Sequence, residues 1–185
     1  MQEFKREYSQ FSLCGLNCSL CPRFQTAGAS KCPGCGGKDF HLRHPSCAVI
    51  TCNKNHDNVQ FCFQCSSWPC DKYQKQKGSD SFITYKNVKK DLTRAGKNLD
   101  EYIDELNEKT SILKFFIDNF NDGRRKSFYC TAVNLLPIKD LRALYEKISS
   151  DAGLKSTNAR EKAVFVSSEL ASSARKLNID LTLRK

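Results

Sequence analysis

Long apolar runs are absent from this sequence of 185 residues, and no stretch approaches the length of a bilayer-spanning helix. We therefore expect no membrane span. Residues 1–10 carry Glu3, Lys5, Arg6 and Glu7 where a signal peptide needs an apolar segment, which favours a cytoplasmic protein. The sequence also lacks a glycine-rich phosphate loop and a Gly-x-Ser-x-Gly motif, and its three histidines have no carboxylate pattern nearby. No catalytic constellation is recognisable, so whether the protein is an enzyme stays open.

Cysteine, by contrast, is abundant and unevenly distributed, because ten of the eleven cysteines fall within one short segment. The ten are Cys14, Cys18, Cys21, Cys32, Cys35, Cys47, Cys52, Cys62, Cys65 and Cys70. A reducing cytoplasm keeps thiols open, so close-spaced cysteines there are more often metal ligands than disulfides. We predict that these ten thiols bind metal, with disulfides as the less favoured alternative.

The clearest metal-binding pattern is Cys32-Pro-Gly-Cys35, which is followed by Gly36 and Gly37. Two cysteines separated by two residues can place both sulfurs on one tetrahedral ion, and glycines let the backbone turn around it. This zinc-knuckle pattern predicts zinc, and ten thiols are enough for two ions. One pairing would join this knuckle to Cys62 and Cys65, but spacing alone does not fix which pairs meet.

An iron-sulfur cluster is the main alternative to zinc. Cys14, Cys18 and Cys21 have the spacing that radical S-adenosylmethionine enzymes use for a four-iron cluster. Those enzymes need a barrel of about 250 residues, whereas more cysteines and then helices follow Cys21. A small electron-transfer protein is the more plausible form of this alternative, and the glycines around Cys35 favour zinc.

Three histidines within the cluster are further metal-ligand candidates, whereas the eleventh cysteine is not. His41, His44 and His56 have ligand-like spacing to nearby cysteines, but thiols are in surplus, so we expect solvated loop histidines first and ligands second. Cys130 stands alone in the sequence and is predicted to be a packed thiol. Two four-thiolate sites would also leave two of the ten clustered cysteines over.

The net charge of +10 suggests nucleic-acid binding as a further alternative. Residues 1–80 contain ten Lys and Arg against six Asp and Glu, a surplus of four. Two tetrathiolate zinc sites, each with a formal charge of about −2, would cancel that surplus. The residues that would contact nucleic acid are Phe61, Phe63 and Trp68 with Lys72, Lys75 and Lys77, or Arg124, Arg125 and Lys126.

Composition and periodicity predict two parts: a small metal-stabilised, Cys-rich domain of zinc-knuckle or ribbon type over residues 1–78, and a mainly α-helical domain over residues 79–185. Apolar stripes predict helices over 88–96, 99–106, 112–120, 138–148 and 158–177. The pattern over 128–136 favours a helix over a strand, and the alternation over 179–184 predicts a short edge strand.

The cysteine segments resemble a known family, the domain-of-unknown-function family 3795. The matching segments are Cys14-Gly15-Leu16-Asn17-Cys18-Ser19-Leu20-Cys21, Cys32-Pro33-Gly34-Cys35, Cys47-Ala48-Val49-Ile50-Thr51-Cys52 and Cys62-Phe63-Gln64-Cys65-Ser66-Ser67-Trp68-Pro69-Cys70. The resemblance implies a prokaryotic cytosolic protein with suspected zinc binding and no assigned activity, and His56 departs from its pattern. We thus expect a noncatalytic zinc-binding module whose helical half, or the groove between the halves, binds a protein partner or a small ligand.

Overall fold

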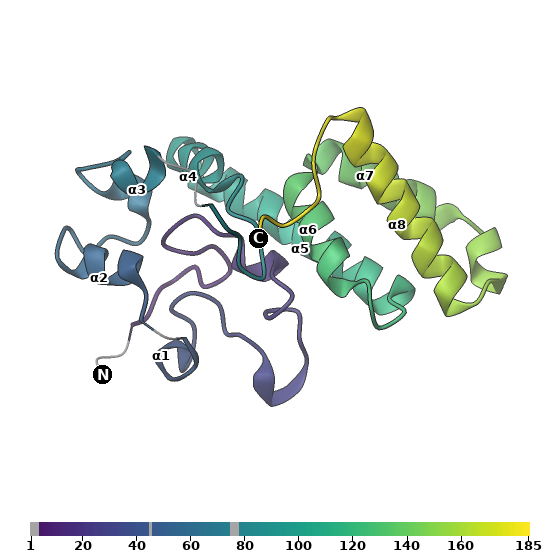
Figure 1. Cartoon of the computed structure of the whole chain (residues 1–185), viewed down its shortest axis with the longest axis horizontal. Helices are drawn as coiled ribbons and strands as arrows, with labels where there is room; N and C mark the ends of the chain where they lie inside the picture. The colour runs from purple at the N-terminus through teal and green to yellow at the C-terminus, as the bar shows by residue number, and fades with distance from the viewer. Residues whose placement is uncertain (1–3, 45, 75–77) are drawn as a thin grey trace.

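The computed structural model describes residues 4–44, 46–74 and 78–185, and every regular element within them is helical (Figure 1). Short helices and loops form the Cys-rich part, and longer helices form the rest. The α-helices are α1 Phe40–Arg43, α2 Ala48–Lys54, α3 Asp71–Gln74, α4 Val88–Lys97, α5 Leu99–Phe120, α6 Lys126–Leu135, α7 Ile138–Ser150 and α8 Ala159–Lys176. Short 3-10 turns lie at Cys18–Leu20, Gly28–Ser30, Cys62–Gln64 and Gly153–Ser156. None of the described helices combines the length and apolar character needed to cross a bilayer.

The predicted starts of two long helices are confirmed by their caps. The side chain of Asn98 accepts a hydrogen bond from the backbone N of Glu101 at 3.2 Å, at the start of α5. Asn158 does the same for Glu161 at 2.9 Å, at the start of α8. Each asparagine satisfies a backbone donor that the first helical turn leaves unpaired. The helical interpretation of residues 128–136 is confirmed as well, because they lie mostly within α6.

The predicted stripes over 99–106 and 112–120 belong to one helix, α5, rather than two. No glycine or proline interrupts residues 107–111, and Lys109 continues the buried face. The Lys109 ammonium donates a hydrogen bond of 2.8 Å to the backbone carbonyl of Leu136, which supplies a partner for its buried charge. The buried face of α5 therefore includes a lysine. Because a lysine is not counted as apolar, the sequence pattern predicted two helices in place of one.

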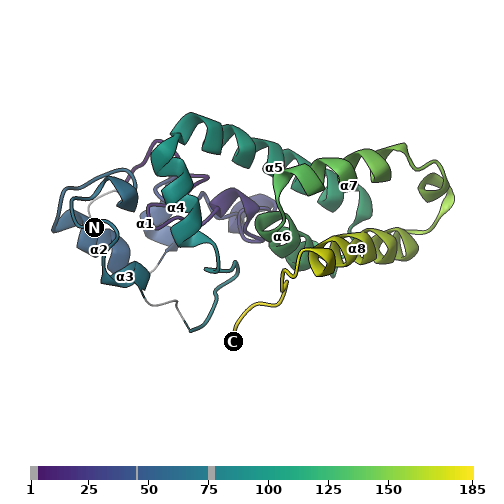
Figure 2. The same ribbon diagram turned by 90° about the horizontal axis from the view of Figure 1, so that it is seen from above.

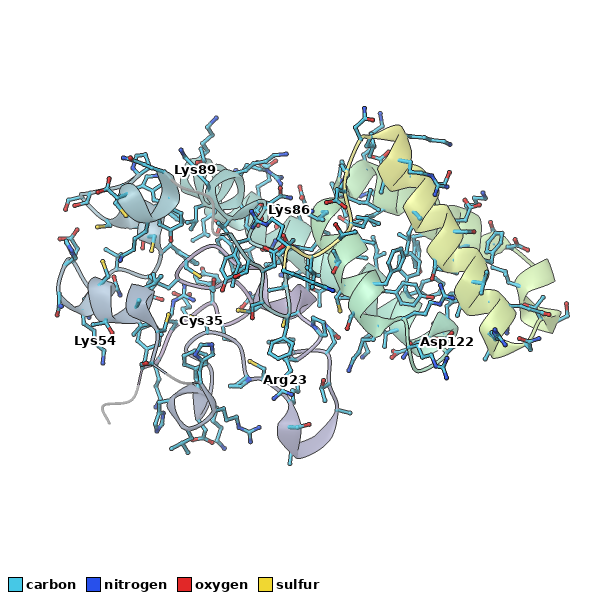
Figure 3. The ribbon with its side chains drawn as sticks, viewed as in Figure 1. Arg23, Cys35, Lys54, Lys86, Lys89 and Asp122 are labelled. Atoms are coloured by element: carbon cyan, nitrogen blue, oxygen red, sulfur yellow. The ribbon has the colours of Figure 1, made fainter. Side chains whose placement is uncertain are left out.

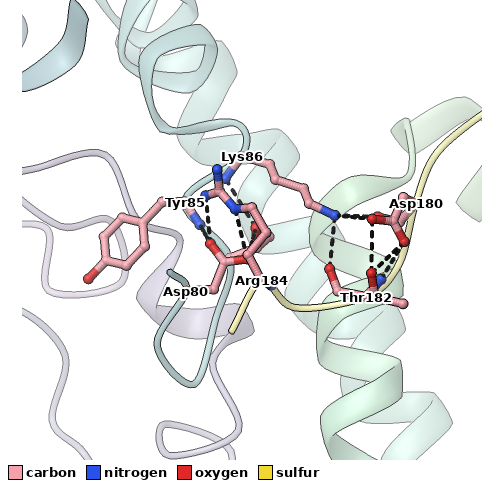
Figure 4. Close-up of polar contacts among 7 residues, drawn as sticks. Asp80, Tyr85, Lys86, Asp180, Thr182 and Arg184 are labelled. Carbon is pink, nitrogen blue, oxygen red and sulfur yellow. Dashed lines mark hydrogen bonds and ion pairs between the residues drawn. The ribbon is translucent and has the colours of Figure 1, made fainter. Parts of the chain in front are cut away.

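The predicted strand over 179–184 is wrong, because this segment makes side-chain contacts in place of a strand ladder (Figure 4). The Asp80 carboxylate accepts hydrogen bonds from the Arg184 guanidinium at 2.7 Å and from the backbone N of Tyr85 at 2.8 Å. The Lys86 ammonium donates to the Asp180 carboxylate and to the Thr182 carbonyl, each at 2.8 Å. These contacts fasten the segment to the loop that precedes α4.

Helix α5 is the centre of the molecule, with α4, α6, α7 and α8 packed along it (Figure 2). The Cys18–Leu20 turn also packs on α5 and α6, where Leu20 is fully buried and the Thr110 hydroxyl donates to the Ser19 hydroxyl at 2.8 Å. One hydrophobic cluster contains Phe11 and Phe61 from the Cys-rich part together with residues of α4 to α8. The two parts therefore share a core, and a domain boundary near residue 78 stays a prediction.

A buried polar network joins the Cys-rich part to three helices. The Asn17 amide donates hydrogen bonds to the Asp91 carboxylate of α4 at 3.2 Å and to the Asn134 side-chain oxygen of α6 at 2.9 Å. The Tyr102 hydroxyl of α5 donates to the Asn17 oxygen at 2.8 Å. All four side chains are buried and cannot bond to water. The network therefore supplies the hydrogen bonds that these polar groups lose on burial.

Gly15 lies next to this network because no side chain fits there. Its φ is +90°, and an added Cβ would lie 2.7 Å from Leu92 Cγ and 2.8 Å from the Val88 carbonyl oxygen of α4. Gly123 has nearly the same φ, +87°, but nothing lies within 4 Å of its Cβ position. Substituting each glycine by alanine therefore separates two free-energy costs, that of a positive φ and that of a steric clash with a neighbouring helix.

We predict that Gly15→Ala lowers the free energy of unfolding by about 2 to 4 kcal/mol, since overpacking adds to backbone strain. Gly123→Ala should cost only about 1 kcal/mol, because it carries the strain alone. Urea unfolding followed by circular dichroism measures both. Equal losses for the two variants would show that the Cys-rich loop does not approach α4 as closely as described.

The ionisation of Asp91 gives a second prediction. Burial raises the pKa of Asp91 to about 6, although the charges of Lys109, Arg94 and Lys90 oppose the shift. The folded protein then holds this proton up to about pH 6, whereas an unfolded aspartic acid releases it near pH 4. Folding stability contributed by this group is therefore present at low pH and is lost as the pH rises from about 4 to 6.

The variant Asp91→Asn should lack this dependence, since its amide oxygen still accepts from Asn17 without carrying a charge. From pH 5 to pH 7.5, we expect the unfolding free energy of the variant to gain about 1 to 2 kcal/mol relative to the wild type. Comparing the two proteins at each pH cancels the groups that titrate alike in both. A difference that does not change with pH would mean that Asp91 is charged throughout.

Candidate metal centre

The ten predicted ligands are all free thiols, and nine of them are partly buried. The tenth, Cys35, is buried (labelled in Figure 3). Cys130 is also free, and it is only 1% exposed in the core formed with α6, which confirms it as a packed thiol. The loops that carry the ten thiols contain no strand within their described residues, so the β-hairpins of a zinc ribbon are absent there. Turns with one or two backbone hydrogen bonds hold these loops instead.

One group of thiols surrounds Leu13. Cys18 and Cys35 pack in the same small apolar cluster as this leucine. Burial is the largest cause that raises the pKa of Cys18, and the charges of Cys35, Cys14 and Cys21 add to it. Burial likewise raises the pKa of Cys35, with added effects from Cys14 and Cys47. The loops meet here because the backbone N of Cys35 donates to the Ser9 carbonyl oxygen at 3.1 Å. We call Cys14, Cys18, Cys35 and Cys47 the first thiol group.

A second group gathers around Cys62, which packs in the same apolar cluster as Cys18 and Cys35. The charges of Cys14, Cys70 and Cys52 act on Cys62, and the backbone N of Cys65 donates to the Cys62 carbonyl at 3.2 Å. The backbone N of Cys62 donates to the Leu13 carbonyl at 3.0 Å, which ties this turn to the first group. We call Cys52, Cys62, Cys65 and Cys70 the second thiol group.

Two of the ten thiols, Cys21 and Cys32, belong to neither group as defined, although the charge of Cys21 also acts on Cys18. Cys32 is close enough to act on the charge of Cys21, and Cys21 acts in turn on the packed Cys130. The backbone N of Cys32 donates to the Arg23 carbonyl at 2.9 Å, which closes the loop between them. Cys32 and Cys35, which the knuckle spacing predicts to share one ion, therefore have different thiol neighbours.

Burial controls the ionisation of the most enclosed thiols. It raises the pKa of Cys35 to about 11 and that of Cys62 to about 12, and it raises the pKa of Cys18 well above its usual value. A buried thiolate needs a nearby positive charge. Arg6 supplies part of it at Cys35, and it also donates to the Phe11 carbonyl at 2.8 Å and lies 4.8 Å over the Phe61 ring. Without a cation beside them, these thiols are protonated at neutral pH.

The sulfurs do not yet form a coordination sphere. Among residues 4–44, 46–74 and 78–185, no three His, Cys, Asp or Glu side chains converge closely enough to hold a metal ion. The soft thiol donors suit zinc or an iron-sulfur cluster, so the chemistry of the donor set fits, but binding requires the thiols to come closer than they lie here. The ligand set remains a prediction.

The histidines proposed as ligands and the aromatic residues proposed to contact nucleic acid differ in how they are packed. His44 stacks on Phe40 at 4.8 Å, His56 is exposed, and the buried Nδ1 of His41 has no hydrogen-bond partner among the described residues. Phe61 is fully buried, and Phe63 stacks on it at 5.3 Å. Trp68 is partly buried against Tyr73. Lys75 and Lys77 lie outside the described residues.

Sequence reasoning missed the residues that support the thiols. The Ser12 hydroxyl lies 3.2 Å from the Cys14 sulfur, and the Tyr73 hydroxyl donates to the Cys14 carbonyl at 3.3 Å. Burial raises the pKa of Tyr73 strongly, and the charges of Cys62 and Cys14 add to the shift, so Tyr73 is a neutral phenol. No motif marks these residues. Only Ser12, two positions before Cys14, could have been chosen from the sequence.

The protein thus consists of a loop-rich segment with clustered thiols, docked on a bundle of helices. Residues 10–75 match the family model described as "Protein of unknown function (DUF3795)", which confirms the resemblance over that part of the chain. The comparison with curated proteins and the comparison with solved structures each found no match. The family description supplies no activity, so function has to be argued from the site.

Proposed function

We propose that the Cys-rich part binds two zinc ions through cysteine thiolates and that these ions stabilise its fold. The observation that supports this proposal is the gathering of thiols near Leu13, where Cys18, Cys35 and Cys62 pack in one small apolar cluster and the charge of Cys14 acts on all three. Four thiolates complete the tetrahedral sphere of a structural zinc. The first thiol group would hold one ion and the second thiol group the other, with Cys21 and Cys32 left over.

The energetics of the Cys-rich part support a structural role for the metal. Its own cluster of buried apolar side chains is small, formed by Leu13, Cys35 and Phe40. Its backbone is held by turns rather than by a continuous ladder. A structural zinc supplies on the order of 10 to 16 kcal/mol in small domains, which exceeds the typical net stability of a whole domain.

Zinc also accounts for the buried thiols and for the local charge. A zinc ion supplies the positive charge that lets Cys18, Cys35 and Cys62 ionise in apolar surroundings. Two tetrathiolate sites, each with a formal charge of about −2, balance the surplus of four positive charges in residues 1–80. A zinc ion with four thiolates has no open position for substrate, so this proposal describes a noncatalytic binding module.

Metal counting tests the proposal. Protein purified without oxygen should be colourless and contain two zinc ions per chain by elemental analysis and native mass spectrometry. Cysteine thiolates must be deprotonated to bind, so the zinc should be released as the pH is lowered. A brown protein that contains iron and sulfide would contradict the proposal and favour the iron-sulfur alternative.

Paired substitutions test the assignment of the thiols. Cys18→Ser with Cys35→Ser should remove the ion of the first thiol group, and Cys62→Ser with Cys70→Ser should remove that of the second. Cys21→Ser with Cys32→Ser is the control, because it removes two partly buried thiols that belong to neither group and should leave both ions. Loss of an ion from this control would show that the division into two groups is wrong.

A further inference from the structure

A cavity of about 450 Å³ lies where the Cys-rich part meets the first helix of the bundle. Its lining residues come from four segments distant in sequence, which are the loop at Cys14, α2, α3, and residues 85–89 at the start of α4. Its volume falls within the range of pockets that bind small organic molecules. Among its described lining residues Cys14 is the one clustered thiol, and lysines of α3 and α4 line it as well.

The charge of the lining favours an anion. Lys72 and Lys89 line the cavity, and among its described lining residues there is no Asp or Glu. Both lysines are exposed, and no ion pair is found for either among the described residues. Lys86 also lines the cavity, but its ammonium is directed to Asp180 and Thr182, away from the Tyr85 ring (Figure 4). Two lysines are therefore available to a negatively charged group.

The remaining lining residues are mostly apolar, which favours a ligand that has an apolar part as well as its anionic group. Val49 from α2 and Val88 from α4 contribute aliphatic side chains. Tyr73 and Tyr85 contribute aromatic rings, and the Tyr73 hydroxyl is occupied by the Cys14 carbonyl. Most small-molecule sites have this composition, in which apolar walls bury the ligand and a few polar groups orient it.

The cavity is also fixed in shape. The backbone N of Tyr85 donates to the Asp80 carboxylate, which is held in turn by Arg184. Tyr73 is fixed by its hydrogen bond to Cys14 and by edge-on packing with Trp68 at 4.6 Å. A preformed pocket avoids part of the ordering cost of binding.

We infer that this pocket, between the thiol-bearing loops and α4, binds a small organic acid that has an apolar body and one anionic group. The anionic group pairs with Lys72 and Lys89, and the apolar body contacts the valines and tyrosines. This site goes beyond the proposed zinc sites and does not depend on them, although Cys14 lines the pocket and belongs to the first thiol group.

Anilinonaphthalene sulfonate, a fluorescent organic anion with an apolar body, is a suitable probe for the intact protein. We expect one binding site by fluorescence titration and a much weaker response to N-phenylnaphthylamine, which is similar but uncharged. Lys72→Gln with Lys89→Gln should weaken binding of the sulfonate by about tenfold or more, because two charge-assisted contacts are lost. Ala48→Trp, which fills the pocket, should abolish binding.

The control is Lys139→Gln with Lys176→Gln, which makes the same change of net charge on α7 and α8 and should leave the affinity unchanged. Circular dichroism and zinc content are measured for every variant, so a lost metal is distinguished from a lost pocket. Equal affinity of the wild type and the Lys72 and Lys89 variant would overturn the inference, as would equal weakening by the control. Binding of several probe molecules that Ala48→Trp does not reduce would also overturn it.

Discussion

The side chain of Asn17 is the contact on which the arrangement of this protein depends. It lies between two of the clustered cysteines, yet its three hydrogen-bond partners come from α4, α5 and α6. Because all four groups are buried, none can exchange its partner for water without a free-energy cost of about 1 to 3 kcal/mol. The network therefore fixes one orientation of the thiol-bearing loop on the helices, whereas apolar contacts alone would tolerate several.

The same contact explains the position of the pocket. Asn17 holds the loop against α4, and Gly15 allows the close approach to Val88 and Leu92. The space that remains between this loop, α3 and the first turn of α4 is the pocket beside Cys14. Residues 14–17 thus include a predicted metal ligand, the glycine and asparagine that pack on the helices, and a residue that lines the candidate ligand site.

The parts of the fold that depend on local signals could be predicted from the sequence. Asn98 and Asn158 cap helices because the relevant donors lie three residues away, and the apolar stripes of α4 and α8 follow from helical periodicity. The partners of Asn17 lie 74, 85 and 117 residues away, and no local pattern indicates them. For the same reason, the sequence did not show that Lys109 continues α5 or that Asp80 fastens residues 179–184.

For the candidate site, the cysteines could be found but not grouped. Spacing suggests that Cys32 and Cys35 act together, while the fold places one beside Cys21 and the other beside Cys14 and Cys47. Two intervening residues limit how far apart the two sulfurs lie, but the loops decide which other sulfurs each of them meets. The pocket was not foreseen, because its lining comes from four separate segments.

Hydrogen exchange measured before and after zinc removal tests the central claim most directly. If zinc stabilises the Cys-rich part and Asn17 couples that part to the helices, amides of residues 10–74 should lose their protection on metal removal. Protection should fall less in α4 and least in α7 and α8, which lie farthest from the thiols (Figure 1). Unchanged protection of residues 10–74 in metal-free protein would contradict the account.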